Sequence, residues 1–121
     1  MSDKAVVNLA TGAAESPDRT IVAFLMATAA QGAGKKTVVF LTVDAVRLGL
    51  VGGADGVAIP GVSPLTDLMA QFADAGGELF VCPPCFNNRE LDPAALLPNA
   101  ALKGGAALWE YIGDGATVLS Y

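Results

Sequence analysis

The chain has 121 residues, enough for a single domain over residues 1–121 with a buried core, and too few for two. Its net charge of −5 and pI near 4.4 argue against a nucleic-acid partner, because proteins that bind the phosphate backbone usually carry excess positive charge. Hydrophobic residues make up 53% of the chain and charged residues 16%, so we expect other subunits to cover some apolar surface.

The N-terminal segment MSDKAVVNL lacks the basic region and long apolar core of a signal peptide. The most apolar helical stretch, residues 20–30, is too short to cross a bilayer. We therefore expect a cytoplasmic protein with no membrane partner. In a reducing compartment, two cysteines are more often chemical than a structural disulfide.

The first half of the chain predicts two strands and two helices. Residues 5–10, AVVNLA, form an apolar run typical of a buried strand, and the loop TGAAESPD follows. Ser16 and Pro17 are typical of a helix start. The helix then has apolar residues at helical spacing, namely Ile21, Phe24, Leu25 and Ala29, and ends at Gly32 and Gly34. The β-branched run TVVFLTV, residues 37–43, predicts a strand covered on both faces, and DAVRLGL predicts a short helix.

The second half continues the alternation of helices and strands. Ser63 and Pro64 open a predicted helix with one apolar face, made of Leu65, Leu68, Met69 and Phe72. ELFVC at residues 78–82 predicts a strand, AALL a short helical piece, ALKGGAALWEYI at residues 101–112 a helix, and ATVLSY the last strand. Strands that alternate with helices indicate a parallel sheet with helices on both faces.

Several chemistry-bearing residues follow the predicted strands. Cys82 ends the third strand, Asp44 follows the second, and Thr11 and Gly12 open the loop after the first. Binding sites of open parallel sheets gather at the carboxyl ends of strands, so we expect these residues at one edge. The glycine-rich loop VGGADG, residues 51–56, is expected to border the same cleft.

Two common ligand motifs are absent. GAGKKT, residues 32–37, lacks the spacing of a phosphate-binding loop and precedes a strand instead of following one. Cys82 and Cys85 are the only cysteines and the chain has no histidine, so it supplies two of the four ligands that a structural zinc site normally takes. We expect no metal and no cofactor.

Thiol chemistry is the stronger interpretation of the Cys82-Pro83-Pro84-Cys85 motif. A cysteine between a strand and a helix meets the positive end of the helix dipole, which favours the thiolate and is expected to lower the pKa from about 8.5 toward 7. Arg89 is expected to add positive charge, and Cys85 is placed to attack a group bound to Cys82. The two prolines, however, remove two N–H donors.

Other readings of the cysteine pair stay open. Two cysteines can act simply as small buried hydrophobes. A thioredoxin fold is disfavoured, because the motif follows the third strand and Val81, not tryptophan, precedes it. Thiol–disulfide exchange on another fold remains an alternative.

The joint placement of these features resembles the DsrE-like family of small sulfur-relay proteins (DsrE, DsrF, TusD). The features are the order of elements, the cysteine that ends ELFVC, Arg89, and the closing GGAALWEYIGDGATVLSY. The resemblance implies a three-layer α/β fold around a mostly parallel five-stranded sheet, often assembled as trimers or hexamers. It also implies that Cys82 carries sulfur as a persulfide between donor and acceptor proteins.

Cys85 departs from the relay members, which typically have a non-thiol residue there. A thiol next to a Cys82 persulfide would release sulfide and leave a disulfide. The primary hypothesis is a sulfur-handling protein, a carrier or sulfurtransferase, with Cys82 as acceptor and Cys85 as resolving thiol. The alternative is a non-catalytic oligomeric protein that binds a small ligand or partner in the cleft bordered by Thr11, Gly12, Asp44 and VGGADG.

Overall fold

The computed structural model describes residues 3–121, and residues 1–2, which open the segment used in the signal-peptide argument, lie outside the described residues. The strands are β1 (Lys4–Leu9), β2 (Lys36–Leu41), β3 (Glu78–Val81), β4 (Ala100–Leu102) and β5 (Thr117–Ser120). The helices are α1 (Pro17–Gly32), α2 (Leu65–Asp74), α3 (Pro83–Asn88) and α4 (Gly105–Ile112), with 3₁₀ turns η1 (Val43–Gly49) and η2 (Pro93–Ala95).

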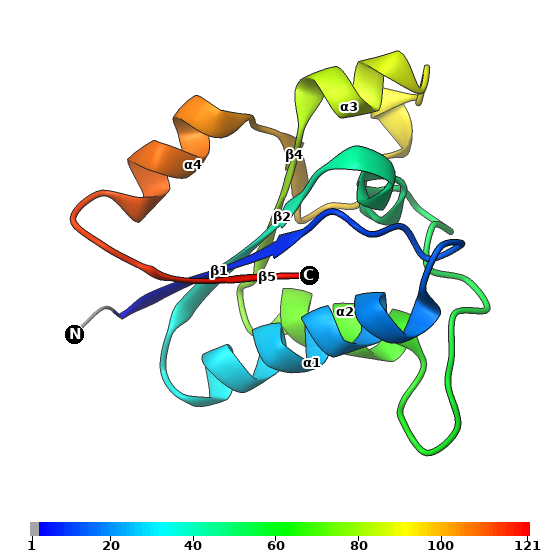
Figure 1. Cartoon of the computed structure of the whole chain (residues 1–121), viewed down its shortest axis with the longest axis horizontal. Coiled ribbons are helices and arrows are strands. Elements are labelled where there is room, and N and C mark those ends of the chain that lie inside the picture. The colour runs from blue at the N-terminus through cyan, green and yellow to red at the C-terminus, as the bar shows by residue number, and fades with distance from the viewer. Residues whose placement is uncertain (1–2) are drawn as a thin grey trace.

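The five strands form one sheet in the order β4-β3-β2-β1-β5, and every neighbouring pair is parallel. Helices α1 and α2 pack on one face and α4 lies on the other, while α3 and η1 lie beyond the carboxyl ends of the strands (Figure 1). The predicted α/β fold with helices on both faces is confirmed. No helix in the described part of the chain is both long and apolar enough to span a bilayer.

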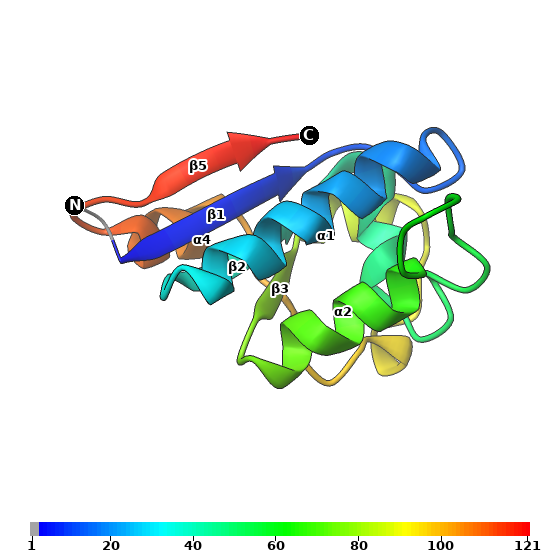
Figure 2. The same cartoon turned by 90° about the horizontal axis from the view of Figure 1, so that it is seen from below.

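The main core lies between the sheet and the pair α1 and α2, which run side by side beneath the strands (Figure 2). Alternate strand residues point into it: Val7, Leu9, Val39, Leu41, Leu79 and Val81. From the helices, Phe24 and Phe72 meet edge to face with ring centroids 5.7 Å apart. These rings close the layer between the two helices and fix their position on the sheet.

The predicted apolar face of α2 is confirmed, since Leu65, Leu68, Met69 and Phe72 are all buried. The predicted start is one residue off, because Pro64 is the N-cap and no side chain caps the helix. In α1, the Ser16 side chain caps the helix as predicted, by accepting a hydrogen bond from Arg19 N–H at 3.3 Å.

The predicted helix α1 is confirmed, but two of its helically spaced apolar residues, Leu25 and Ala29, are exposed. The core instead uses Thr20, Ile21, Ala23, Phe24 and Ala27. The helix is apolar on both sides, so helical spacing alone does not say which apolar face turns inward.

Strand β4 overlaps the start of the segment that the sequence pattern assigns to a helix. Leu79 N–H donates to Asn99 O at 2.9 Å, and Lys103 N–H donates to Val81 O at 3.1 Å, so this short segment completes the sheet at the β3 edge. Alanine and leucine have no strong β preference, so its strand conformation comes from pairing with β3 rather than from local propensity. The helix begins only at Gly105.

Helix α4 covers the opposite face of the sheet with no fully buried residue of its own. Tyr111 is its main contact: the phenol donates to Lys36 O at 2.7 Å, and the ring meets Phe80 edge to face at 6.0 Å. Lys4 Nζ donates to the carbonyls of Tyr111 and Ile112 at 2.7 and 2.9 Å. A cation at these carbonyls satisfies acceptors that a helix C-terminus leaves free, so Lys4 ties α4 to the sheet.

Candidate functional site: a cysteine pair at the carboxyl edge of the sheet

The carboxyl ends of β1, β2 and β3 lie side by side, because Leu9 pairs with Leu41 and Leu41 with Val81. Two further hydrogen bonds continue the ladder past the strands: Thr42 N–H donates to Leu9 O at 3.0 Å and Cys82 N–H donates to Leu41 O at 2.9 Å. The segments that carry the predicted site residues therefore leave the sheet at one edge, as the sequence pattern indicated.

Cys82 and Cys85 lie in the first turn of α3, and both are free thiols of intermediate burial. Cys82 is the N-cap residue, and its carbonyl accepts a hydrogen bond from Phe86 N–H at 3.0 Å. Pro83 and Pro84 occupy the first two helical positions, where an N–H has no partner within the helix, so they fit without loss. Phe86 is fully buried and anchors the turn in the core.

Burial raises the pKa of the Cys82 thiol above its ordinary value of 9.0. The Cys85 N–H donates to Cys82 and opposes this rise, whereas the Cys85 side chain adds to it. The expectation of a pKa lowered toward 7 is therefore wrong. The physical reason is burial of the thiol, which the two prolines leave poorly offset because they remove the first two N–H groups of the helix.

Asp44 forms ion pairs with two arginines beside the cysteines. Its Oδ1 accepts from Arg47 Nε at 2.8 Å and from Arg89 Nε at 3.2 Å. The Arg47 hydrogen bond is the largest cause that lowers the pKa of Asp44 below its ordinary value. Asp44 therefore pairs with two guanidinium groups at once.

Arg89 connects this cluster to the cysteine turn. Its Nη1 donates to the Cys85 carbonyl at 3.1 Å, while its Nε binds Asp44, so the guanidinium fastens α3 to η1. The structure thus brings the Arg89 charge to the cysteine turn, where it binds the Cys85 carbonyl, and an effect of this charge on the Cys82 thiolate stays a prediction. The observed contacts make Arg89 a positioning residue for the turn.

Thr11 and Gly12 complete this edge from the side of β1. Thr11 is buried, and the Gly12 carbonyl accepts from Glu15 N–H and Ser16 N–H at 3.1 Å each. The Asp44 side chain fills the space where a Cβ on Gly12 would stand. Val43, directly before Asp44, has φ of 52°, a left-handed conformation that β-branched residues rarely adopt. Gly12, Asp44, Arg89 and Cys85 thus form one continuous set of contacts. A catalytic role for Cys85 and Arg89 and a binding role for Asp44 and Gly12 stay predictions.

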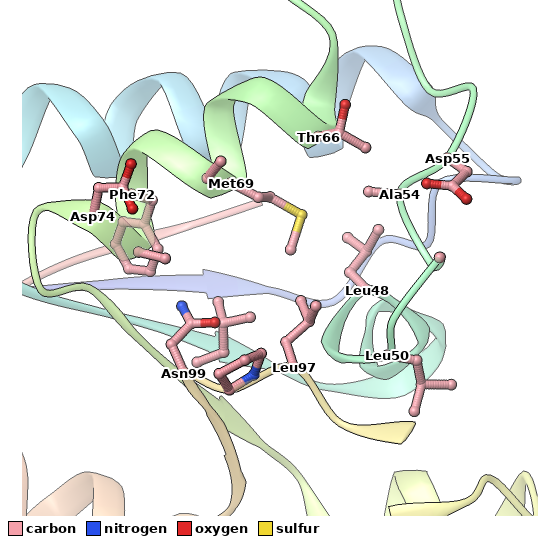
Figure 3. A pocket seen from close by; sticks show the side chains of 15 residues that line it. Leu48, Leu50, Ala54, Asp55, Thr66, Met69, Phe72, Asp74, Leu97 and Asn99 are labelled. Carbon is pink, nitrogen blue, oxygen red and sulfur yellow. The ribbon is translucent and has the colours of Figure 1, made fainter. Parts of the chain in front are cut away.

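A separate cavity of about 640 Å³ lies on the α2 side of the sheet (Figure 3). Gly52, Ala54 and Asp55 of the VGGADG loop line it, but Thr11, Gly12, Asp44 and the cysteines do not. Its other wall includes Leu97 and Asn99, which carried no signal in the sequence because they belong to an irregular segment before β4. The VGGADG loop therefore borders this cavity on the α2 side, whereas the strand-end residues lie at the carboxyl edge of the sheet. The expectation that both border one cleft is wrong.

The described residues contain no group of three or more Cys, Asp or Glu side chains arranged to hold a metal ion. The site chemistry available at this edge is that of two adjacent thiols with a paired carboxylate and two guanidinium groups beside them.

Comparison with known proteins places the whole chain in one family. Residues 4–121 match the DsrE/DsrF-like family. The fold is similar to the crystal structure of the ychN protein from E. coli, with a TM-score of 0.74 and 18% sequence identity over 98% of this chain and 99% of that one. No curated protein matches the sequence. Because the family match extends over nearly all of the chain, this protein belongs to the DsrE/DsrF-like family.

Proposed function

We propose that this protein handles sulfane sulfur, with Cys82 as the acceptor of a persulfide sulfur and Cys85 as the thiol that resolves it. The observation that carries the proposal is the placement of the two thiols in one turn, because Cys82 is the N-cap of α3 and Cys85 lies in the first turn of that helix. Both thiols are free and partly exposed at the carboxyl edge of the sheet. Membership of the DsrE/DsrF-like family, which is associated with sulfur relay, supports the same chemistry.

In the uptake step, the Cys82 thiolate attacks the outer sulfur of a donor persulfide. A Cys82–sulfur bond forms, the donor's sulfur–sulfur bond breaks, and the donor leaves as a thiolate. Cys82 then holds one sulfane sulfur, and no external oxidant or reductant is needed.

Two steps can follow from that persulfide. An acceptor thiolate can take the outer sulfur and return Cys82 to a thiolate, which is transfer. Alternatively, the Cys85 thiolate attacks Cys82 Sγ, a Cys82–Cys85 disulfide forms, and hydrosulfide leaves. In this second step the two cysteines supply the two electrons that reduce the sulfane sulfur to sulfide. We place the protein in a reducing compartment such as the cytoplasm, where cellular thiols would restore the pair.

Intact-mass measurement after incubation with a small persulfide donor tests this function on wild type, Cys82→Ser and Cys85→Ser. We expect a gain of about 32 mass units, one sulfur, that requires Cys82 and lasts longer in Cys85→Ser. We also expect wild type to lose about 2 mass units, the mark of the disulfide, as sulfide appears in solution. Equal sulfur uptake by Cys82→Ser and wild type would refute the assignment.

We also propose that the protein forms a homo-oligomer of the kind expected from its apolar composition. Trp109 on α4 is 72% exposed, and Val118, which pairs with Val6 on the same sheet face, is 48% exposed. Large apolar side chains that stay exposed favour burial against another subunit. Light scattering coupled to size exclusion should give a trimer or hexamer for wild type and a smaller species for Trp109→Glu. A monomeric wild type would contradict this.

A further inference from the structure

The cavity on the α2 side of the sheet is separate from the cysteine edge and is not used by the sulfur chemistry. It lies between α2 and the segment that leads into β4, with η1 at one end (Figure 3). Its volume of about 640 Å³ falls within the range of small-molecule sites in proteins.

The inner wall of the cavity is apolar. Met69, Leu48 and Leu97 point into it, and the Met69 thioether stands near its centre (Figure 3). Phe72 and Leu79 also line this wall. Met69, Leu48, Phe72 and Leu79 are at least nine-tenths buried and belong to the core, so this wall is preformed. Methionine adapts its shape to irregular apolar ligands, which suits a site that receives a flexible hydrocarbon.

The charged groups at the cavity are all of one sign. Asp74 stands at one end and Asp55 at the other, and none of the described residues that line the cavity is basic (Figure 3). Within residues 3–121 no ion pair or side-chain hydrogen bond is found for either carboxylate. Asp74 is also the last residue of α2, where the helix dipole disfavours a negative charge and no basic residue compensates.

These observations together point to the chemistry of the occupant. An apolar wall excludes a strongly polar molecule, since desolvation of its polar groups would not be repaid. Two unpaired carboxylates repel an anion and attract a cation. We propose that this cavity binds a small molecule with an apolar body and a cationic amine end, seated with its hydrocarbon against Met69 and its ammonium at Asp55 or Asp74. The site is independent of the cysteine pair.

Three probes of the same chain length separate the contribution of the apolar chain from that of the charged end. They are n-octylamine (a cation at neutral pH), 1-octanol (neutral) and octanoate (an anion). Each is titrated into the uniformly ¹⁵N-labelled full-length protein, with amide shifts followed by NMR. We expect octylamine to bind about two- to fivefold tighter than octanol, and octanoate to bind weakest, because exposed carboxylates contribute modestly. The shifted amides should cluster at Leu48, Met69 and Leu97.

Two pairs of variants test where the probes bind and whether the carboxylates determine the preference for a cation. Ala73→Phe places a ring in the cavity from a partly buried position of α2 and should abolish binding, whereas Gln71→Phe adds the same ring to an exposed position outside the cavity and should not. The double variant Asp55→Asn, Asp74→Asn should bring octylamine affinity down to that of octanol. Asp67→Asn, which removes a carboxylate of the same helix away from the cavity, should leave the preference unchanged.

Three results would overturn the proposal. Octanoate binding as tightly as octylamine would remove the argument from charge. Shifts that cluster elsewhere, or that persist in Ala73→Phe, would place the site elsewhere. If none of the probes binds and Ala73→Phe lowers the oligomeric mass in light scattering, a second copy of the chain occupies the cavity instead.

Discussion

The side chain of Asp44 occupies the space in which a side chain on Gly12 would stand. A Cβ built on Gly12 would overlap Asp44 Oδ2 and approach Asp44 Cβ to 3.0 Å. Asp44 also binds Arg89, and Arg89 binds the Cys85 carbonyl. A glycine at position 12 therefore helps to hold the cysteine turn in place, because it leaves room for the Asp44 side chain.

We expect Gly12→Ala to push Asp44 away from Arg89 and to destabilise the protein by about 1–3 kcal/mol, the usual cost of a forced steric overlap. Urea unfolding measures this loss. Gly32→Ala is the matched control, since nothing lies within 4 Å of its Cβ at the end of α1, and it should be neutral or stabilising by up to about 1 kcal/mol. Equal stability of the two variants would contradict the packing of Asp44 against Gly12.

Asp44→Asn should weaken the protein at neutral pH by about 1 kcal/mol, because two guanidinium groups lose their carboxylate partner. The pKa of Asp44 is lowered in the folded state below 3.8, so its contribution is present above about pH 4 and disappears as the pH falls through the folded pKa. The stabilities of wild type and variant should therefore converge in acid. Urea unfolding at several pH values checks this, with Asp114→Asn in an exposed turn as the control for loss of a charge alone. A constant difference across the pH range would exclude the ion pair as its source.

Cys85→Ala should lower the pKa of Cys82 relative to wild type. The variant removes the Cys85 side chain, which raises that pKa, and keeps the Cys85 N–H, which lowers it. The rate of alkylation of Cys82 by iodoacetamide, followed by peptide mass spectrometry against pH, should have its midpoint above that of an ordinary cysteine in wild type and at lower pH in the variant. At neutral pH the variant should react faster. An unchanged or higher midpoint would show that Cys85 does not contact the Cys82 sulfur.

The phenol of Tyr111 should ionise at a higher pH than that of an ordinary tyrosine. Burial and the charge of Glu78 raise the pKa of Tyr111 to about 12. In Tyr121→Phe, which leaves Tyr111 as the only tyrosine, the absorbance of tyrosinate should rise with a midpoint near 12. A midpoint near 10 would mean that α4 does not hold Tyr111 against the sheet.

Ionisation of Tyr111 should also lower the free energy of unfolding in alkali. The contribution of the protonated phenol is fully present below about pH 10 and is lost as the pH rises through about 12. Tyr111→Phe removes the hydrogen bond to Lys36 O and should cost about 1 kcal/mol at neutral pH, as measured by urea unfolding. It should also abolish the alkaline loss that wild type shows.

The layout of strands and helices was readable from the sequence because it depends on local signals. The apolar runs at residues 5–10 and 37–43, the Ser16 cap and the apolar face of α2 each specify their element within a few residues of chain. The placement of Cys82, Asp44 and Gly12 at one edge also followed, since parallel strands bring all their carboxyl ends together.

Other features depended on contacts between segments far apart in the chain, and only the tertiary structure decided them. β4 is a strand because it pairs with β3, and the inward face of α1 was set by packing, since both of its faces are apolar. The pKa of Cys82 rises because burial outweighs the single N–H that the proline turn leaves. The cavity beside Met69 exists because α2 and residues 97–99 meet across the sheet edge, and no stretch of sequence shows that space. Local patterns determine the elements of this protein, whereas burial and distant pairing determine the chemistry of its sites.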